Sequence, residues 1–146
     1  MGSFNHSYLQ SKLSAIFMQM DGVIALTELS LDTSSIKAQF PHVSDTLVPD
    51  ISIYPTREIN LERDVYKMTE MPLLIIEILS PRQSVQQLVD KMEFYFSLGI
   101  QSGWLVYPAS KTISVYKAPF NSQSFSGELL VDKVLNLELQ LSMVFG

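Results

Sequence analysis

The sequence predicts one α/β domain in which a mixed β-sheet is flanked by α-helices. Three observations carry this prediction: a helical apolar repeat near the start, a continuous apolar run over residues 73–79, and a second helical repeat over residues 83–98. Short strand-like segments lie between and after them, so the order is helix, strands, helix, strands. A chain of 146 residues that is 47% hydrophobic can bury one core, and we expect a single domain spanning residues 1–146.

The first predicted helix begins at Asn5, a good N-cap residue, and ends at Asp21-Gly22. The alternating segment 23–31 predicts a strand, and the Ser- and Asp-rich segment 32–47 predicts a turn or an irregular hairpin. A further strand is expected over residues 48–54, closed by Pro55. The apolar residues of the first helix recur at helical spacing: Leu9, Leu13, Ile16, Phe17 and Met20.

The second half of the chain alternates between strand-like and helical patterns. Residues 56–71 are charged and lack periodicity, which predicts a loop or short helix that could cover a site. Residues 73–79 predict a central buried strand, and residues 83–98 predict a helix that Gly99 ends. Residues 104–107 and 112–116 predict a hairpin. In the tail, 125–145, we expect another hairpin around Gly127-Glu128 and a weakly amphipathic end.

Composition excludes several kinds of site. The chain has no cysteine and two histidines, so thiolate chemistry is excluded and any metal should have oxygen ligands. Its formal charge of −5 at pH 7 counts against tight nonspecific binding to a phosphate backbone, although carboxylates gathered around a metal contribute to that charge. There is no signal-peptide pattern and no membrane-length apolar run, so a cytoplasmic protein without a membrane anchor is expected.

Two carboxylates lie within apolar, strand-like segments: Asp50 follows Pro49, and Glu77 interrupts the run 73–79. Burying a charge in such a strand is costly without a partner. A pair of carboxylates at the ends of adjacent strands would suit Mg²⁺, which prefers one or two carboxylates with waters and a phosphate. Lys91, at the edge of the apolar stripe of the second helix, could reach this pair.

Each of these residues also has a purely structural interpretation. Asp50 alone would be a turn or strand-end residue, Glu77 could pair with Lys91 or an arginine for stability, and Lys91 alone would be a solvated helix residue. His6 shares a helix face with apolar residues, so a core or interface role competes with a contact to phosphate or metal-bound water. Glu28 could be a further carboxylate near the metal or part of a strand-edge salt bridge.

The motifs Pro49-Asp50 and Glu77-Ile-Leu-Ser80-Pro81, followed by the helical Lys91, resemble the PD-(D/E)XK nuclease superfamily, most closely its Uma-type branch of restriction endonucleases. The resemblance continues through Tyr95, Gly99 and the segment 104–108. It spans about residues 5–117 and leaves the tail unassigned. The chain differs from the family pattern at three positions: Leu79 replaces the superfamily lysine, Gln87 a common acid, and Tyr107 a common aspartate.

The resemblance implies a restriction-endonuclease-like fold and a hydrolase that cuts nucleic acid with Mg²⁺ or Mn²⁺. In that reading Asp50 and Glu77 hold the metal, Lys91 positions or polarises the attacking water, and residues 56–71 help to admit the strand. DNA is the expected partner rather than RNA. The alternative is a noncatalytic module that keeps the nuclease fold for binding or dimerisation, and an accessory protein of a mobile element is neither supported nor excluded. A homodimer is expected because Phe94, Tyr95 and Phe96 make the second helix apolar on more than one side.

Overall fold

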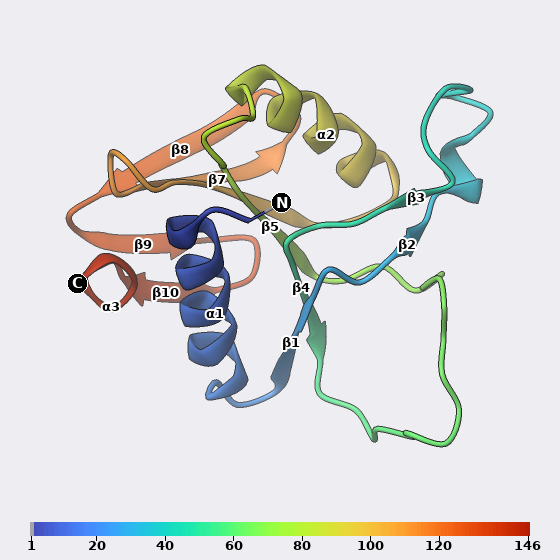
Figure 1. Cartoon of the computed structure of the whole chain (residues 1–146), viewed down its shortest axis with the longest axis horizontal. Helices are drawn as coiled ribbons and strands as arrows, with labels where there is room; N and C mark the ends of the chain where they lie inside the picture. Colours follow the sequence, from blue (N-terminus) through green and yellow to red (C-terminus); the bar gives the residue numbers. More distant parts are fainter. Residues whose placement is uncertain (1) are drawn as a thin grey trace.

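The computed structural model describes residues 2–146, and it contains the predicted mixed sheet flanked by helices (Figure 1). Six strands form the main sheet in the order β1-β4-β5-β6-β7-β8. Only β5 and β6 run parallel, while the other neighbours in this sheet are antiparallel. The elements are α1 (Phe4–Met18), β1 (Val23–Thr27), β2 (Leu31–Asp32), η1 (Ser34–Ile36), β3 (Thr46–Leu47), β4 (Ile51–Pro55), β5 (Leu74–Ile78), α2 (Val85–Ser97), β6 (Ser102–Tyr107), β7 (Thr112–Ala118), β8 (Asn121–Ser126), β9 (Leu129–Asp132), β10 (Leu137–Gln140) and α3 (Ser142–Phe145).

The main sheet has a hydrophobic core on each face. On one face, α1, the β9–β10 hairpin and α3 pack over Trp104, which is fully buried and lies 5.5 Å from the ring of Phe17. On the other face, α2 and the β2–β3 segment enclose a second core around Leu88 and Met92. Figure 1 shows α1 and α2 on opposite sides of the central strands. The two helices therefore supply the covers that the two amphipathic repeats predicted.

Helix α1 begins earlier than predicted. Ser3, in an extended conformation, is its N-cap and accepts a hydrogen bond from the backbone N–H of His6 at 3.2 Å, so Asn5 lies inside the helix. A serine hydroxyl caps a helix as well as an asparagine amide does, and the residue types alone do not choose between them. The predicted end at Asp21-Gly22 is close, because the helix ends at Met18 and Gly22 has φ of +84°.

Strand β5 is the central buried strand that the apolar run predicted, and all five of its residues are buried between β4 and β6. Helix α2 follows it and begins with a capping box between Ser84 and Gln87. The helix lies close to β6 at Gly103, where an added Cβ would sit 2.7 Å from the sulfur of Met92. The glycine therefore allows the helix to approach the sheet.

Two predicted strand arrangements are wrong. The segment 23–31 is not one strand, because Glu28 has φ of +52° and separates β1 from β2. The hairpin expected around Gly127-Glu128 is also absent from the described residues: β8 pairs with β7, and β9 pairs with β10. Gly127, with φ of +73°, instead turns the chain out of the main sheet into the separate β9–β10 hairpin.

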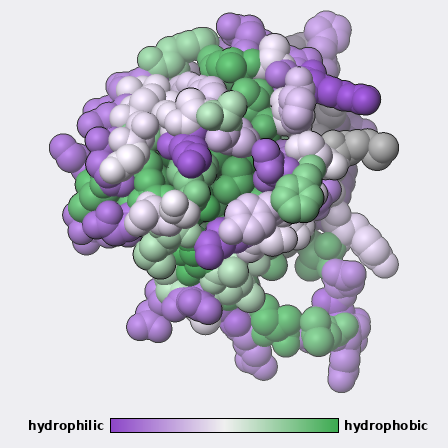
Figure 2. Space-filling view, turned by 60° about the vertical axis from the view of Figure 1, so that its left-hand side comes forward, coloured by the Kyte–Doolittle hydropathy of each residue, from purple (hydrophilic) through white to green (hydrophobic). Residues whose placement is uncertain are grey.

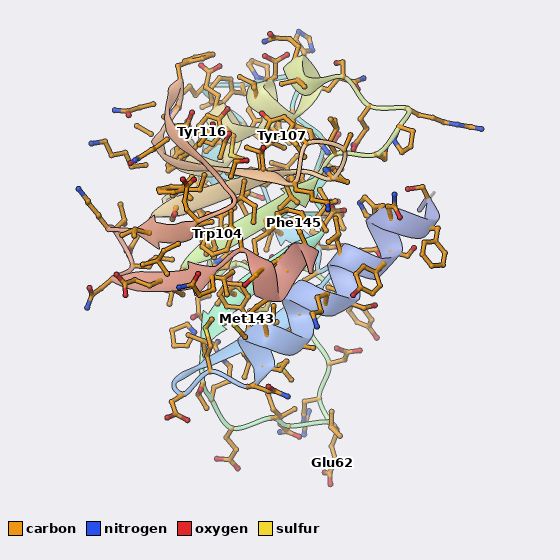
Figure 3. All side chains as sticks on the ribbon, turned by 90° about the vertical axis from the view of Figure 1, so that its left-hand side faces the viewer. Glu62, Trp104, Tyr107, Tyr116, Met143 and Phe145 are labelled. Atoms are coloured by element: carbon orange, nitrogen blue, oxygen red, sulfur yellow. The ribbon has the colours of Figure 1, made fainter. Side chains whose placement is uncertain are left out.

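The loop 56–71 does not cover the predicted site, which corrects the expectation that it admits the substrate strand. It joins the end of β4 to the start of β5, whereas Asp50 precedes β4 and Glu77 lies near the end of β5. Because β4 and β5 are antiparallel, Asp50 and Glu77 lie together at one end of the two strands and the loop lies at the other end. In Figure 3, Glu62 lies on this loop, far from the sheet residues Trp104 and Tyr107. The loop also appears at the lower end of Figure 2, with both hydrophobic and hydrophilic residues.

The aromatic surface expected to bind a second copy is partly covered within the chain. Phe94 of α2 packs against Phe40 with ring centroids 5.0 Å apart in an edge-to-face arrangement, and Tyr95 is 1% exposed. The homodimer therefore stays a prediction that this surface no longer favours. Within residues 2–146, no helix is long and apolar enough to cross a membrane.

Candidate active site

Three acidic residues occupy neighbouring backbone positions on adjacent chain segments at one end of the sheet. Thr27 of β1 pairs with Ile51 of β4, and Ile51 pairs with Ile76 of β5. One position further along both ladders, Glu28 comes beside Asp50, and Asp50 beside Glu77. The backbone N–H of Glu28 donates to the carbonyl of Asp50 at 3.2 Å, which continues the pairing. Like charges on adjacent strands repel, so this row favours a bound cation or compensating donors.

Asp50 and Glu77 each hold the backbone of the other's strand. The N–H of Asp50 donates to Glu77 Oε1 at 3.1 Å, and the N–H of Ile78 donates to Asp50 Oδ2 at 2.7 Å. Each carboxylate therefore occupies a place where a ladder hydrogen bond between the two strands would otherwise form. This reciprocal contact fixes both side chains relative to the sheet.

Glu77 points toward α2, and the residue is 2% exposed to solvent. Glu77 Oε2 accepts a hydrogen bond from the hydroxyl of Tyr95 at 3.0 Å and lies 3.4 Å from Lys91 Nζ. Burial raises the pKa of Glu77, and the charge of Asp50 raises it further, while Lys91 and the hydrogen bonds from Asp50 and Tyr95 lower it. Burial, with the nearby charge of Glu77, also raises the pKa of Tyr95 well above its ordinary value.

Asp50 faces the opposite side, toward α1. His6 Nε2 lies 3.0 Å from Asp50 Oδ2, and the amide of Gln10 donates to the carbonyl of Asp50 at 2.9 Å and to Glu28 Oε2 at 3.3 Å. Within the described residues, Asp50 Oδ1 accepts no hydrogen bond, so one oxygen of this carboxylate remains available.

A cavity of about 440 Å³ opens in front of Asp50. Its walls carry both signs of charge, because Glu28 and Arg82 line it together with Asp50 and His6. Glu77 is not part of this lining and lies behind Asp50. A phosphate entering the cavity would therefore meet Asp50 and Glu28 on the sheet and Arg82 on the loop that follows β5.

The structure brings the three residues predicted from sequence, Asp50, Glu77 and Lys91, into one cluster. Sequence reasoning missed the hydroxyl of Tyr95, although Tyr95 follows Lys91 by one helical turn and therefore shares its face. It also gave His6 no more than a minority role at a site. The signal that could have found His6 is the polar series His6 and Gln10, which projects from α1 at a spacing of four residues.

The donor set fits a small divalent cation with oxygen ligands. Asp50 has a free oxygen on the cavity, and Glu28 is a second carboxylate on the same wall. Within residues 2–146, no group of three or more acidic or histidine side chains is arranged to surround a metal. Mg²⁺ is commonly held by one or two carboxylates and completed by waters and substrate phosphates, so the arrangement suits Mg²⁺ or Mn²⁺ better than a fully protein-ligated metal.

Comparisons with known proteins show the fold and the family of this chain. A crystal structure described as a putative nuclease from Anabaena variabilis ATCC 29413 has a TM-score of 0.76 and is 24% identical, covering 99% of this chain and 82% of that one. This likeness shows the shared fold. No curated protein matches the chain. The model of the Uma2 family, described as "Putative restriction endonuclease", matches residues 1–144, and the chain therefore belongs to the Uma2 family.

Proposed function

We propose that this protein is a divalent-metal-dependent endonuclease that hydrolyses phosphodiester bonds, with DNA as its substrate. The observation that carries the proposal is the pair of carboxylates Glu28 and Asp50 on one cavity wall, with Glu77 hydrogen-bonded to the backbone of Asp50 and Lys91 Nζ 3.4 Å from Glu77. Membership of the Uma2 family supports the same reaction class. The geometry of a row of carboxylates with one lysine is suited to holding a metal and a water beside a phosphate.

Asp50 and Glu77 would hold the metal, as expected from the sequence; for Glu77, which faces α2 and does not line the cavity, this requires its side chain to turn toward Asp50. A bound Mg²⁺ or Mn²⁺ lowers the pKa of a coordinated water and stabilises the charge that develops on the phosphate. Lys91 can orient the attacking water, because its ammonium reaches the Glu77 carboxylate from the partly exposed side of α2. Arg82, on the wall of the cavity, can pair with a phosphate oxygen of the strand.

The overall charge makes this proposal depend on the cation. With a formal charge of −5, the chain repels a polyanion, and the site contains three of its fifteen acidic residues. A divalent ion at Asp50 reverses the local sign of the potential. DNA binding should therefore be weak without the metal.

A second candidate function, a noncatalytic binding module, is favoured by one specific observation. Glu77 already receives three donors, the N–H of Asp50, the hydroxyl of Tyr95 and the ammonium of Lys91. Such a closed network can stabilise the fold without any metal. The two functions differ in their response to Mg²⁺. A metal that binds only the folded protein stabilises it by about 2.7 kcal/mol at a hundredfold excess over Kd, and so raises the melting temperature. A closed network without a metal site leaves the melting temperature unchanged.

The test combines metal binding with cleavage. Mn²⁺ is titrated by calorimetry into the wild-type chain, into Asp50→Asn and Glu77→Gln, and into the control Glu62→Gln, which alters an exposed carboxylate on the remote loop. Supercoiled plasmid and a single-stranded RNA are incubated with the same proteins. We expect a heat of Mn²⁺ binding and plasmid nicking in the wild type and in Glu62→Gln, and neither in the two site variants. Retained nicking in Asp50→Asn or Glu77→Gln would refute the assignment, and a wild type without metal binding would favour the noncatalytic module.

A further inference from the structure

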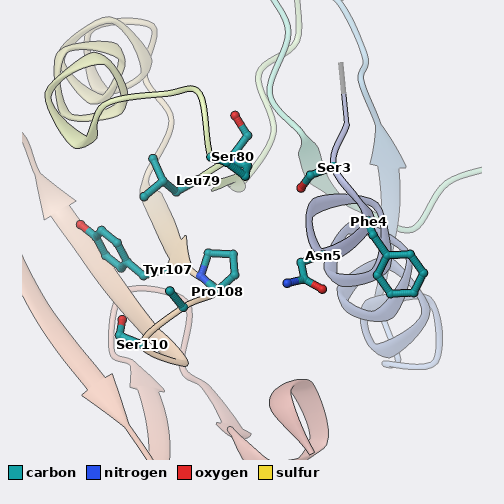
Figure 4. Close-up of a pocket in the computed structure, with 10 residues that line it drawn as sticks. Ser3, Phe4, Asn5, Leu79, Ser80, Tyr107, Pro108 and Ser110 are labelled. Atoms are coloured by element: carbon teal, nitrogen blue, oxygen red, sulfur yellow. The ribbon is translucent and has the colours of Figure 1, made fainter.

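A second cavity, of about 550 Å³, lies beside the candidate active site (Figure 4). It is formed by three segments: the start of α1, the connection that follows β5, and the turn between β6 and β7. Its size falls within the range of small-molecule sites, about 300–1,000 Å³. The lining residues are Ser3, Phe4, Asn5, Leu79, Ser80, Pro81, Tyr107, Pro108, Ala109 and Ser110.

The two cavities are adjacent and differ in chemistry. Ser80 lines both of them, and a smaller cavity lined by Ser80, Pro81 and Arg82 lies alongside. The cavity at Asp50 carries charged groups, whereas no lining residue of the second cavity has a charged side chain. One ligand that spans both would therefore need a charged part next to an uncharged part.

The second cavity lies where the parallel strands β5 and β6 end. The chain leaves β5 at Ile78 and enters the wall at Leu79, and it leaves β6 at Tyr107 and enters the wall at Pro108. Ligands of open α/β sheets bind outside the carboxyl ends of parallel strands. Leu79, the first wall residue after β5, follows Glu77 by two residues, so the cavity lies next to the candidate site along the chain.

The walls present flat apolar surfaces on one side and an amide on the other. In Figure 4, Tyr107, Pro108 and Leu79 lie on one side of the cavity, and the side chain of Asn5 projects from α1 toward Pro108. No hydrogen bond within the described residues engages the Asn5 amide, and Asn5 is exposed. An asparagine amide offers a donor and an acceptor side by side, which matches the polar edge of a nucleobase.

We propose that this cavity binds one nucleobase of the nucleic-acid strand, next to the phosphate held at Asp50. The proposal rests on the proposed function, because it places the base beside the bond to be cut. A nucleobase is uncharged, has two flat apolar faces and carries donors and acceptors on its edge, so it satisfies both the uncharged wall and the Asn5 amide. The neighbouring phosphate belongs in the charged cavity, and the ligand as a whole has the charged and uncharged parts that the two cavities require.

The test uses adenosine, which has a base and no phosphate and therefore does not need the metal site. Isotope-labelled protein is titrated with adenosine while its backbone amide resonances are followed by NMR, and ribose 5-phosphate is titrated in parallel. We expect saturable shifts at Leu79, Tyr107 and Ser110 with adenosine and none there with ribose 5-phosphate. Asn5→Ala should weaken adenosine binding about tenfold, the loss expected for one amide–base pair.

Two further variants make the test specific. Ala109→Glu introduces a carboxylate at an exposed position of the uncharged wall, so it should weaken adenosine binding without unfolding the chain. Asn121→Ala removes an exposed asparagine on β8, outside this cavity, and should bind adenosine like the wild type. Equal affinity in Asn5→Ala, Ala109→Glu and the wild type would overturn the proposal. So would shifts that ribose 5-phosphate reproduces, or no shifts with adenosine.

The base-binding proposal and the proposed function fail separately. Adenosine binding at Leu79 and Tyr107 in a protein that neither binds Mn²⁺ nor nicks plasmid would support the nucleobase cavity and refute the nuclease. Nicking that requires Asp50 in a protein whose cavity does not respond to adenosine would support the nuclease and refute the nucleobase cavity.

Discussion

Replacing Tyr95 by phenylalanine should destabilise the protein more at neutral than at acidic pH. The Tyr95 hydroxyl is buried and donates to Glu77 Oε2 at 3.0 Å, and the change removes this donor while keeping the ring. The carboxylate keeps two donors, the N–H of Asp50 and the ammonium of Lys91. The variant therefore tests whether a charged Glu77 depends on its buried partners.

The expected size follows from the type of hydrogen bond. A hydrogen bond to a charged group contributes about 1.5–3 kcal/mol, and one between neutral groups about 1 kcal/mol. With Glu77 ionised, Tyr95→Phe should therefore cost about 2 kcal/mol. For a chain of this length, that corresponds to a fall in melting temperature of about 6 °C, at about 3 °C for each kcal/mol.

The pH dependence has a defined sign. Burial raises the pKa of Glu77 above its ordinary value of 4.5, so the folded state holds this proton more tightly than the unfolded state. The contribution of Glu77 to stability is therefore greatest below pH 4.5 and falls as the pH rises through the folded pKa. Loss of the Tyr95 hydroxyl raises this pKa further, because the hydrogen bond favours the charged form. The difference in stability between variant and wild type should then grow from about 1 kcal/mol to about 2 kcal/mol.

Urea unfolding measured from below pH 4.5 to neutral pH tests the effect, and Tyr54→Phe is the matched control. Tyr54 is also fully buried, but its hydroxyl donates to the backbone carbonyl of Glu70 at 2.9 Å, and burial raises its pKa to about 12. Its variant should lose about 1 kcal/mol with no pH dependence between acidic and neutral solution. Identical pH profiles for Tyr95→Phe and Tyr54→Phe would refute the reasoning about Glu77.

Three further predictions concern the metal, a helix cap and a second buried carboxylate. Mn²⁺ affinity, measured by calorimetry, should fall as the solution is acidified, because protons compete for Glu77, whose pKa is raised; a constant affinity would exclude Glu77 as a ligand. Ser84→Ala removes the N-cap of α2 and should cost about 1 kcal/mol in thermal unfolding, while an unchanged melting temperature would show that the cap contributes nothing. Asp132→Asn should cost about 2–3 kcal/mol in urea unfolding, because an amide N–H₂ would face donors such as Trp104 Nε1; an unchanged midpoint would contradict this.

The sequence was most informative where burial and charge conflict. Glu77 in a continuous apolar run required a partner, and the structure places Lys91 and Tyr95 beside it. The central strand and the second helix were predicted from the spacing of their apolar residues. A continuous apolar run is typical of a buried strand, and an apolar repeat at helical spacing is typical of a helix. Their order also predicted the helices that flank the sheet.

What could not be predicted depends on contacts between distant parts of the chain. Asp132 is fully buried, and none of its hydrogen-bond donors within residues 2–146 is charged. It accepts hydrogen bonds from Ser102, Trp104 and the backbone of the loop that follows it. Nothing in its neighbourhood in the sequence indicates the side-chain donors Ser102 and Trp104, which lie 30 and 28 residues away. The choice of Ser3 over Asn5 as a cap, and the break at Glu28, likewise depend on how the chain packs locally.

The hydrogen bonds that Asp50 and Glu77 each accept from the backbone of the other segment make the assembly of the site depend on the alignment of two strands. If β4 slipped by one residue against β5, the N–H of Asp50 would leave Glu77 and the side chain of Asp50 would turn to the other face of the sheet. A chain that has collapsed without this alignment therefore lacks the site altogether. Any chemistry at this position therefore depends on the completed pairing of β4 with β5.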